Sequence, residues 1–498
     1  MRLRLVALAV TSAVLAGCGG GASAGSADPA QALPADAVGY VELVVRPDAT
    51  ERAELERVIN RFFDGDAGKQ IVERVEEGFE GVPGRVTYAQ DIEPWLGRRL
   101  GVAVLGFEAR PRFVLAAAIR DRGAAEDFVA RDDKAEGAVK RSYQDVDYYR
   151  EGSGTTVGVV GDYLVVARDE QDFKRAVAAE SSGRSLATAP AFEASLGKLR
   201  GDHVAAGYLD VKRVIASDAP RLSRGAAARL EQATLNGETV AAVARTDGDS
   251  VSVDARVTKV PPTSEASPLI RELPAEAWAA LAITDVGTPF QQGVDEARAE
   301  PGGAMIDRVL GRLGLDLERD LYSWVGDGAA FATGTSAAGV GGAVILTAGD
   351  PALARAALPR FARAARRTGL EVRESTLGGR ADQSFSIPVP AGPGPVSFAQ
   401  AGDRVVVAVG ERAMDEALEP GATIADDGLY DRAREAVGDL EPYLIVEAPK
   451  LLELLDAIVP DDESLAAARP YLTQLGLVAF GAKRDGGDLR TRLTVALK

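Results

Sequence analysis

The residue with the clearest chemistry in this chain is its only cysteine, Cys18. It ends the sequence Leu-Ala-Gly-Cys, which follows Arg2, Arg4 and an apolar run over residues 5–15. This pattern is typical of a bacterial lipoprotein signal peptide, in which the thiol takes a diacylglyceryl group and the preceding residues are removed. We therefore predict residues 1–17 as a signal peptide and Cys18 as the lipidation site. An ordinary secretory signal with a chance cysteine is the alternative.

Ser195 and Lys198 match the Ser-x-x-Lys pattern of penicillin-recognising enzymes, in which the lysine helps to remove the proton of the serine hydroxyl. The Lys-Thr-Gly and Ser-Asp-Asn motifs of those enzymes are absent, and Gly197 disfavours the helix that would bring the two side chains together. The only histidine, His203, could act as a general base. A surface or strand-edge position explains it better, so we predict no catalytic residues.

Acidic side chains flank glycine at Asp247 and Asp249, and again at Asp485 and Asp488. A calcium loop needs several converging oxygens that end in a bidentate acid, whereas the twelfth position from Asp247 is Thr258. Reverse turns between strands explain both sequences better. One histidine and one cysteine also leave no pair of ligands for a zinc site. We predict no metal and no cofactor.

Tyr143, Tyr148 and Tyr149 cluster just before a predicted strand. Core packing and the strand preference of tyrosine are the first explanation, and a stacking surface for a ligand is the alternative. The sequence assigns no other ligand-binding residues.

The chain has 498 residues, of which 46% are hydrophobic and 26% are charged, and its formal net charge is −17. This length and composition indicate a folded protein of two domains. The negative charge repels phosphate backbones and anionic lipid headgroups, so we predict no nucleic-acid partner. No second apolar run approaches the roughly 20 residues that cross a membrane. The predicted membrane attachment is therefore the lipid on Cys18.

Sequence features of the first half recur in the same order in the second half. Residues 33–43 begin with Leu-Pro-Ala-Asp, and residues 273–283 begin with Leu-Pro-Ala-Glu. Gly-Asp turns at Gly161 and Gly402 each precede an apolar strand and then a helix, and each half ends in a hairpin. This internal repetition predicts two copies of one fold.

Residues 260–269 lie between the copies and contain three prolines, which prevent a continuous helix or strand. The predicted order is a Gly/Ser-rich flexible tether over 18–31, a first repeat over 32–259, this linker, and a second repeat over 270–498. Residues 112–119 are among the alternating apolar stretches that predict strands. Strands joined by hairpins and covered by helices predict an α+β fold, with a mainly antiparallel sheet in each copy and helices on one face.

The Leu-Pro-Ala-Asp/Glu openings, the Gly-Asp-x-x-Val-Val-Ala strands and the sequence ending at Cys18 resemble the bacterial envelope lipoproteins grouped as domain of unknown function 3352. The resemblance covers most of residues 30–498 and rests on turn and core patterns. It implies an extracytoplasmic lipoprotein and supplies no catalytic residues.

These patterns predict a lipid-anchored protein on the extracytoplasmic face of the cell membrane, acting as a non-enzymatic binding or interaction module. Its partner would be an envelope protein, a polymer or a lipid. The alternative is a carrier that holds an apolar, lipid-like ligand between sheet and helices or between the two repeats. An enclosed apolar cavity favours the carrier, whereas filled cores and an exposed groove favour the interaction module. An enzyme of unrecognised type is the third possibility.

Overall fold

The computed structural model describes residues 26–62, 87–107, 111–135, 137–218, 224–262, 264–299, 302–336, 339–375, 377–389, 394–459 and 462–498. The chain divides into two compact units, Met1–Pro261 with Asp485–Arg490 (unit 1) and Pro262–Arg484 with Thr491–Lys498 (unit 2). The division falls inside the stretch predicted as a linker. Cys18 and the predicted signal peptide lie outside the described residues.

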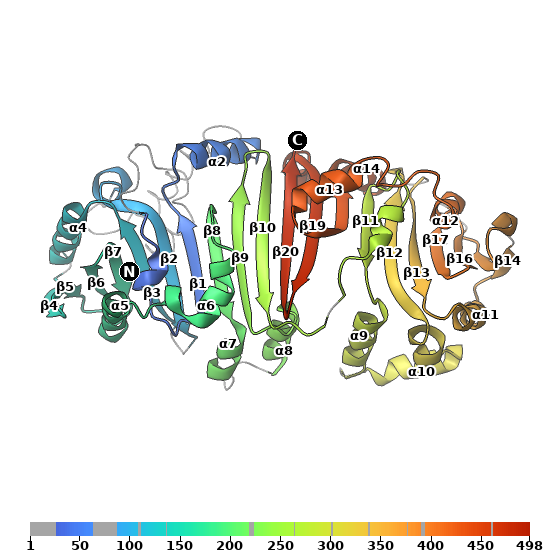
Figure 1. The fold of residues 1–498 in the computed structure, drawn as a ribbon, viewed down its shortest axis with the longest axis horizontal. Helices are drawn as coiled ribbons and strands as arrows, with labels where there is room; N and C mark the ends of the chain where they lie inside the picture. The colour runs from blue at the N-terminus through green and yellow to red at the C-terminus, as the bar shows by residue number, and fades with distance from the viewer. Residues whose placement is uncertain are drawn as a thin grey trace. The chain divides into compact units, whose positions relative to one another are not determined.

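Within the described residues, unit 1 contains ten strands and the helices that connect them (Figure 1). Its strands are β1 (Gly39–Val44), β2 (Leu96–Gly106), β3 (Arg112–Ile119), β4 (Val139–Tyr143), β5 (Val146–Arg150), β6 (Thr156–Val160), β7 (Tyr163–Ala167), β8 (Ala205–Asp210), β9 (Thr239–Thr246) and β10 (Ser250–Thr258). Its helices are η2 (Pro29–Ala32), α2 (Ala49–Phe62), η3 (Tyr88–Ile92), α4 (Arg122–Ala135), α5 (Glu170–Ser182), η4 (Leu186–Thr188), α6 (Pro190–Ala194), η5 (Leu196–Lys198), α7 (Val211–Asp218) and α8 (Arg224–Ala233).

Unit 2 begins with the short helix η6 and continues through the strands and helices drawn from β11 onward in Figure 1. Its strands are β11 (Ala279–Ile283), β12 (Val325–Thr333), β13 (Gly341–Ala348), β14 (Arg373–Ser375), β15 (Gln383–Ile387), β16 (Val396–Ala401), β17 (Arg404–Val409), β18 (Glu441–Glu447), β19 (Leu475–Asp485) and β20 (Asp488–Leu497). Its helices are η6 (Pro268–Glu272), α9 (Gly287–Ala299), α10 (Ala304–Leu313), η7 (Glu318–Tyr322), α11 (Pro351–Arg367), η8 (Leu377–Gly379), α12 (Glu411–Leu418), α13 (Leu429–Val437), α14 (Ala448–Ile458) and α15 (Glu463–Leu472).

The strands follow the same order in both units. In unit 1 the order is β4-β5-β6-β7-β3-β2-β1-β8-β9-β10, and in unit 2 it is β14-β15-β16-β17-β13-β12-β11-β18-β19-β20. Neighbouring strands in the sheet of each unit run antiparallel. The predicted α+β class with an antiparallel sheet is therefore confirmed.

The prediction that helices cover only one face of each sheet is wrong. Along β3, Val114 and Ala116 pack in one core with α5, whereas Leu115 and Ala117 pack in a second core with α4. In unit 2, α12 and α11 likewise lie over two separate cores. Residues 113–119 form a nearly continuous apolar run, which is the pattern of a strand buried on both faces. We interpreted this stretch as alternating, and that choice produced the error.

The tether predicted over residues 18–31 is wrong for its last residues. Pro29–Ala32 forms the 3₁₀ helix η2, and the Asp28 side chain caps it by accepting from the Ala30 amide at 3.0 Å. Ala30 and Ala32 are fully buried in the unit 1 core. The ordered part of unit 1 thus begins before Ala32, because small apolar residues after Asp28 pack against the sheet.

Candidate functional site

Helix α5 begins and ends on capping residues that fix which of its faces meets the core. The Asp169 carboxylate accepts from the Asp172 amide at 2.8 Å, and Gly183 ends the helix with a left-handed φ of 66°. Phe173 and Val177, one helical turn apart, are buried against the sheet. The outer face then carries polar and small side chains: Lys174, Arg175, Ala178, Ser181 and Ser182.

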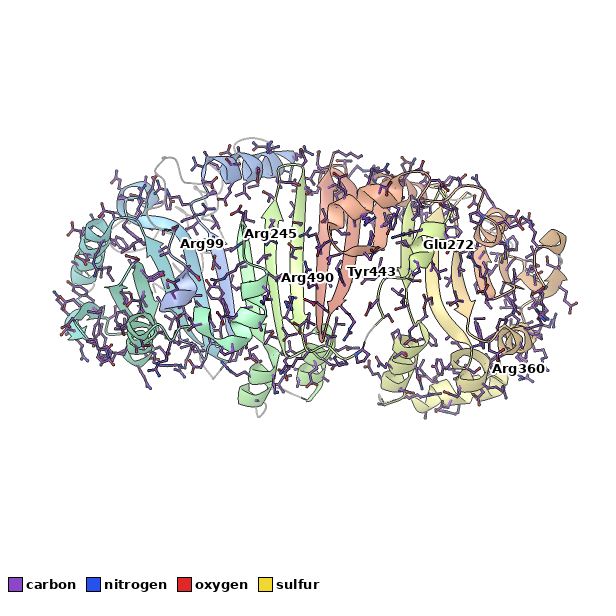
Figure 2. All side chains as sticks on the ribbon, viewed as in Figure 1. Arg99, Arg245, Glu272, Arg360, Tyr443 and Arg490 are labelled. Carbon is purple, nitrogen blue, oxygen red and sulfur yellow. The ribbon has the colours of Figure 1, made fainter. Side chains whose placement is uncertain are left out.

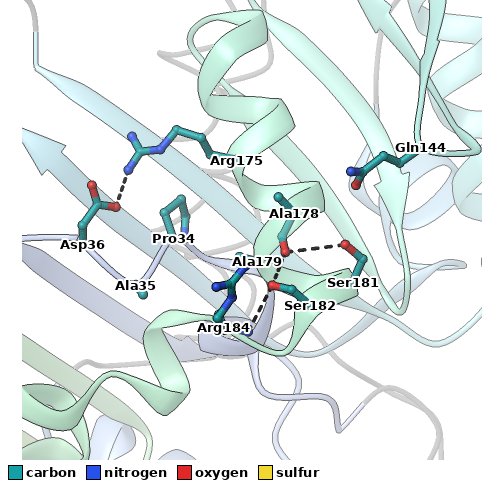
Figure 3. A pocket seen from close by; sticks show the side chains of 10 residues that line it. All are labelled: Pro34, Ala35, Asp36, Gln144, Arg175, Ala178, Ala179, Ser181, Ser182 and Arg184. Carbon is teal, nitrogen blue, oxygen red and sulfur yellow. Dashed lines mark hydrogen bonds and ion pairs between the residues drawn. The ribbon is translucent and has the colours of Figure 1, made fainter.

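Two adjoining hollows lie along this outer face of α5. The first has a volume of about 400 Å³ and lies between α5 and the segment before β1 (Figure 3); it is lined by Pro34, Ala35, Asp36, Gln144, Arg175, Ala178, Ala179, Ser181, Ser182 and Arg184. The second, of about 540 Å³, is lined by Tyr143, Glu170, Gln171, Lys174, Arg175 and Ala178. Both are open, and they share Arg175 and Ala178. We call the pair the α5 trough.

Glu170 is the most heavily bonded acid in the trough. Its carboxylate accepts from Lys174 Nζ at 2.7 Å, from the Tyr148 hydroxyl at 2.8 Å and from Arg141 at 2.8 Å. The hydrogen bonds from Lys174 and then Tyr148 lower the pKa of Glu170 to about 2. Lys174 also lies 5.3 Å from the centre of the Tyr143 ring. Glu170 is thus ionised, and its carboxylate already accepts hydrogen bonds from three side chains of the protein.

Arg175 joins the two hollows through two acidic partners. It forms an ion pair with the exposed Asp36 (Figure 3) and another, at 3.1 Å, with Asp172, which is fully buried. Arg112 holds the other side of the Asp172 carboxylate. Arg184 differs from these cations, because its guanidinium makes no hydrogen bond or ion pair with any residue that the structure describes. Among the described residues that line the trough, it is the one guanidinium with no partner that an added anion would displace.

Ser195 and Lys198 do not form the catalytic pair that their spacing suggests. The helix α6 ends at Ala194, so the two residues lie on a separate 3₁₀ turn. Ser195 is fully buried, and its hydroxyl donates to the Ala191 carbonyl at 2.7 Å. Lys198 is exposed.

We expected a surface or strand-edge position for His203; it lies two residues before β8, but it is buried and not at the surface. Its Nε2 lies 3.0 Å from Glu42 Oε1 and its Nδ1 lies 2.7 Å from the Gly201 carbonyl. The Tyr40 hydroxyl donates to Glu42 Oε2 at 2.6 Å, and Arg99 lies 3.2 Å from Oε1 (Figure 2). Each nitrogen of the imidazole therefore has an oxygen within hydrogen-bond distance.

Burial by itself would raise the pKa of Glu42. Hydrogen bonds from His203 and Tyr40, together with the Arg99 charge, outweigh burial and hold the pKa below its usual value. Glu42 was missed in the sequence, although strand alternation places it on the same buried face as Tyr40 and Val44. A charged residue at a core-facing position was the available signal.

The three tyrosines of the sequence cluster separate in the structure. Tyr148 is buried, with its ring 5.0 Å from that of Phe173. Tyr149 packs in the opposite core with α4. Only Tyr143 reaches the trough, so core packing explains two members and the third lies at the candidate site. The structure does not assemble the three rings into the stacking surface that was the alternative interpretation.

The aspartates proposed for calcium form turns. Asp247 Oδ1 accepts from the amides of Asp249 at 3.0 Å and Ser250 at 2.7 Å between β9 and β10. Among the described residues, no group of three or more histidine, cysteine or acidic side chains could hold a metal ion. In the same part of the chain, no helix is both long and apolar enough to span a bilayer.

The residues of the trough that sequence reasoning missed are its cations. Aligning the strand-turn-helix segments that begin at Gly161 and Gly402 pairs Lys174 with Asp415 and Arg175 with Glu416. Arg184 corresponds to Ala422, because Leu186 bonds the Leu33 carbonyl at 2.8 Å just as Ile424 bonds that of Leu273. All three cations are thus confined to unit 1. A comparison of the two halves position by position would have shown this in the sequence.

A family model described as "Protein of unknown function (DUF3352)" matches residues 5–436. No curated protein matches the chain. Among solved structures, crystal form I of TP0453 is 12% identical, and the match covers 80% of this chain and 98% of that one at a TM-score of 0.18. Crystal form IV of TP0453 is also 12% identical, covering 79% and 97% at the same TM-score. A TM-score this low establishes no shared fold.

Proposed function

Since this chain belongs to the DUF3352 family of proteins of unknown function, we propose that it is a lipid-anchored, extracytoplasmic binding module without enzymatic activity, and that its binding surface is the α5 trough. The observation that carries the proposal is the open trough on unit 1, lined by charged and apolar side chains, whose cations have no equivalent at the aligned positions of unit 2. A surface that differs between two similar frameworks is a candidate for function.

We further propose that the two units are copies of one fold. The identical strand order supports this, as does a detailed contact that occurs in both. Trp95 Nε1 donates to the Asp91 carbonyl at 2.7 Å, and Trp324 Nε1 donates to the Asp320 carbonyl at 2.7 Å. The Asp91 carboxylate binds Arg131 and that of Asp320 binds Arg360, at 2.6 Å in each case. Chance is a poor explanation for two such clusters at the same place in the strand order.

The lipid anchor is proposed from the sequence around Cys18. Two or three acyl chains, at roughly 0.8 kcal/mol for each buried methylene, hold a protein stably at a membrane. Attachment there would place the units on the extracytoplasmic face of the cell membrane, within reach of envelope proteins, polymers and lipids. The Cys18→Ser variant should leave the membrane fraction, and mature-size protein that stays there would contradict the anchor.

The carrier alternative has less support. Both hollows of the trough are open and have charged side chains in their lining, whereas a lipid-like cargo needs an enclosed apolar space. The catalytic alternative also lacks support, since the hydroxyl of Ser195 is buried and bonded to the backbone. Neither an enclosed apolar space for a lipid-like cargo nor a catalytic site at Ser195 supports these alternatives in the described residues.

The binding surface is tested by photo-crosslinking in cells. A benzophenone amino acid at Gln171, which is exposed and lines the trough, should form adducts with the partner. The matched control is the same amino acid at Arg412, the position on α12 that corresponds to Gln171. Adducts at Gln171 that are absent at Arg412 support the proposal. Equal adducts at both positions, or none at Gln171, would refute the assignment of the trough.

A further inference from the structure

We infer that the α5 trough binds a polyhydroxylated polymer that carries spaced carboxylate or phosphate groups. This inference rests on the proposed function and names the chemistry of its ligand. The trough presents three cations, Lys174, Arg175 and Arg184, against two acids, Asp36 and Glu170. The chain as a whole has a net charge of −17, so the trough is less acidic than the chain average.

Arg184 supplies the first contact. Its guanidinium is exposed and has no intramolecular partner among the described residues, so an oxyanion can bind both of its forked donors without displacing anything. Arg175 supplies a second contact. The Asp36 side chain that it binds is 66% exposed, so an incoming oxyanion can replace this carboxylate on the guanidinium at little cost.

The spacing of the cations favours a polymer over a small ion. Arg175 and Arg184 are nine positions apart along α5 and its C-terminal cap, which corresponds to roughly 13 Å at the helical rise. The two arginines therefore offer two separate backbone positions from which an oxyanion can be bound. A chain with repeating oxyanions can occupy both positions at once, which strengthens binding without any new contact.

The surface between the two arginines suits hydroxyl groups. Ser181 and Ser182 both donate to the Ala178 carbonyl, at 3.5 and 2.6 Å. Ser182 Oγ also accepts from the Arg184 amide at 3.3 Å, so each hydroxyl oxygen keeps a lone pair that can accept from a ligand. The amide of Gln144 offers a donor and an acceptor from the β4–β5 turn (Figure 3). An exposed apolar anchor that would favour a lipid acyl chain is absent from the lining residues of both hollows.

The test uses the mature chain with Cys18→Ser and two fluorescent probes, hyaluronan oligosaccharides with one carboxylate per disaccharide and poly(glycerol phosphate). Binding is followed by fluorescence anisotropy, and the preferred probe identifies the oxyanion. We expect Arg184→Ala to weaken binding by about tenfold, since a charged hydrogen bond contributes on that scale. Arg184→Lys should recover part of the loss. The triple variant Lys174→Asp/Arg175→Glu/Arg184→Ala, which installs the unit 2 residues, should abolish binding.

Arg412→Ala, which removes an exposed cation from α12, is the matched control and should leave the affinity unchanged. Binding of neither probe, or an equal loss in Arg184→Ala and Arg412→Ala, would overturn the inference. Tighter binding to phosphatidylglycerol vesicles than to either polymer, lost in Arg184→Ala, would overturn it in favour of a lipid. If Gln171 crosslinks a partner in cells while both probes fail, the proposed function stands and the polymer assignment falls.

Discussion

Unit 1 buries charged groups at a place where unit 2 is apolar. Glu42 pairs with Gly101 of β2, and the equivalent pair in unit 2 is Ala282 with Ala329 of β12. By the same registers, Tyr40, Glu42 and His203 stand where unit 2 has Ala280, Ala282 and Leu440. The strand order that the two units share therefore does not require buried charges at these positions. Unit 1 fills them with polar and charged side chains, and unit 2 fills them with apolar ones.

Small residues opposite large ones make both solutions possible. A Cβ on Gly101 would lie 2.8 Å from the Tyr40 ring, so glycine is needed in unit 1. In unit 2, Ala280 leaves room for the Cβ of Ala329. Buried ion pairs seldom exceed well-packed apolar residues in stability. We conclude that the Glu42 cluster is a property of unit 1 and not of the fold.

The largest effect is expected from replacing Glu42 with the alanine of unit 2. Glu42→Ala leaves the His203 ring, the Tyr40 hydroxyl and Arg99 without their acceptor. We expect the free energy of unfolding of unit 1 to fall by about 3–5 kcal/mol, because the remaining buried charge is unpaired. The loss is measured by denaturant titration of the full chain, with amide hydrogen exchange in each unit as the readout.

The double variant Glu42→Ala/His203→Leu carries the unit 2 residues at both positions and removes the orphaned imidazole, while Arg99, whose side chain is 20% exposed, keeps contact with water. It should recover most of that loss, to within about 2 kcal/mol of the parent. If the double variant is as unstable as Glu42→Ala, the two units are not interchangeable at this place and the comparison fails.

The second prediction concerns how the stability of unit 1 changes at acidic pH. Because the pKa of Glu42 is lower in the folded state than its ordinary value of 4.5, its ionisation contributes stability above about pH 4.5. That contribution is lost as the pH falls through the folded pKa. The Glu42→Ala/His203→Leu variant should therefore lose less stability than the parent between pH 5 and the folded pKa. Unfolding titrations at a series of pH values test this, and parallel curves for the two proteins would contradict it.

Sequence patterns predicted the strands, helices and turns of this fold better than the contacts between residues far apart in the chain. The turns at Gly161 and Gly402 have the positive φ that the sequence indicates, 53° and 59°, because glycine between short strands is a local signal. The burial of His203 was missed because it depends on Glu42, 161 positions away in the chain. The trough was missed for a related reason. Its lining joins the segment at Asp36, the β4–β5 turn and α5, and only folding brings these three together.

The third prediction compares one ion pair that both units contain. Arg131 and Arg360 (the latter labelled in Figure 2) each lie 2.6 Å from the equivalent aspartate. The Arg131 side chain is 65% exposed, whereas that of Arg360 is 31% exposed. Arg360→Ala should cost unit 2 about 1–2 kcal/mol, since Asp320 is fully buried and hydrogen bonds to its charge are strong. Arg131→Ala should cost unit 1 less than about 1 kcal/mol. Equal losses, measured by denaturant unfolding of each unit, would show that burial does not set the difference.

The smallest effect on stability is expected from Arg184→Ala, which installs the unit 2 residue Ala422. Arg184 is exposed and has no partner among the described residues, so its removal breaks no intramolecular bond. We expect the free energy of unfolding to stay within about 0.5 kcal/mol of the parent. The same variant is expected to lose polymer binding, and this separation distinguishes a binding residue from a structural one. A stability loss of more than about 1 kcal/mol would mean that Arg184 serves the fold of unit 1, and the contrast with Ala422 would then carry no information about a ligand.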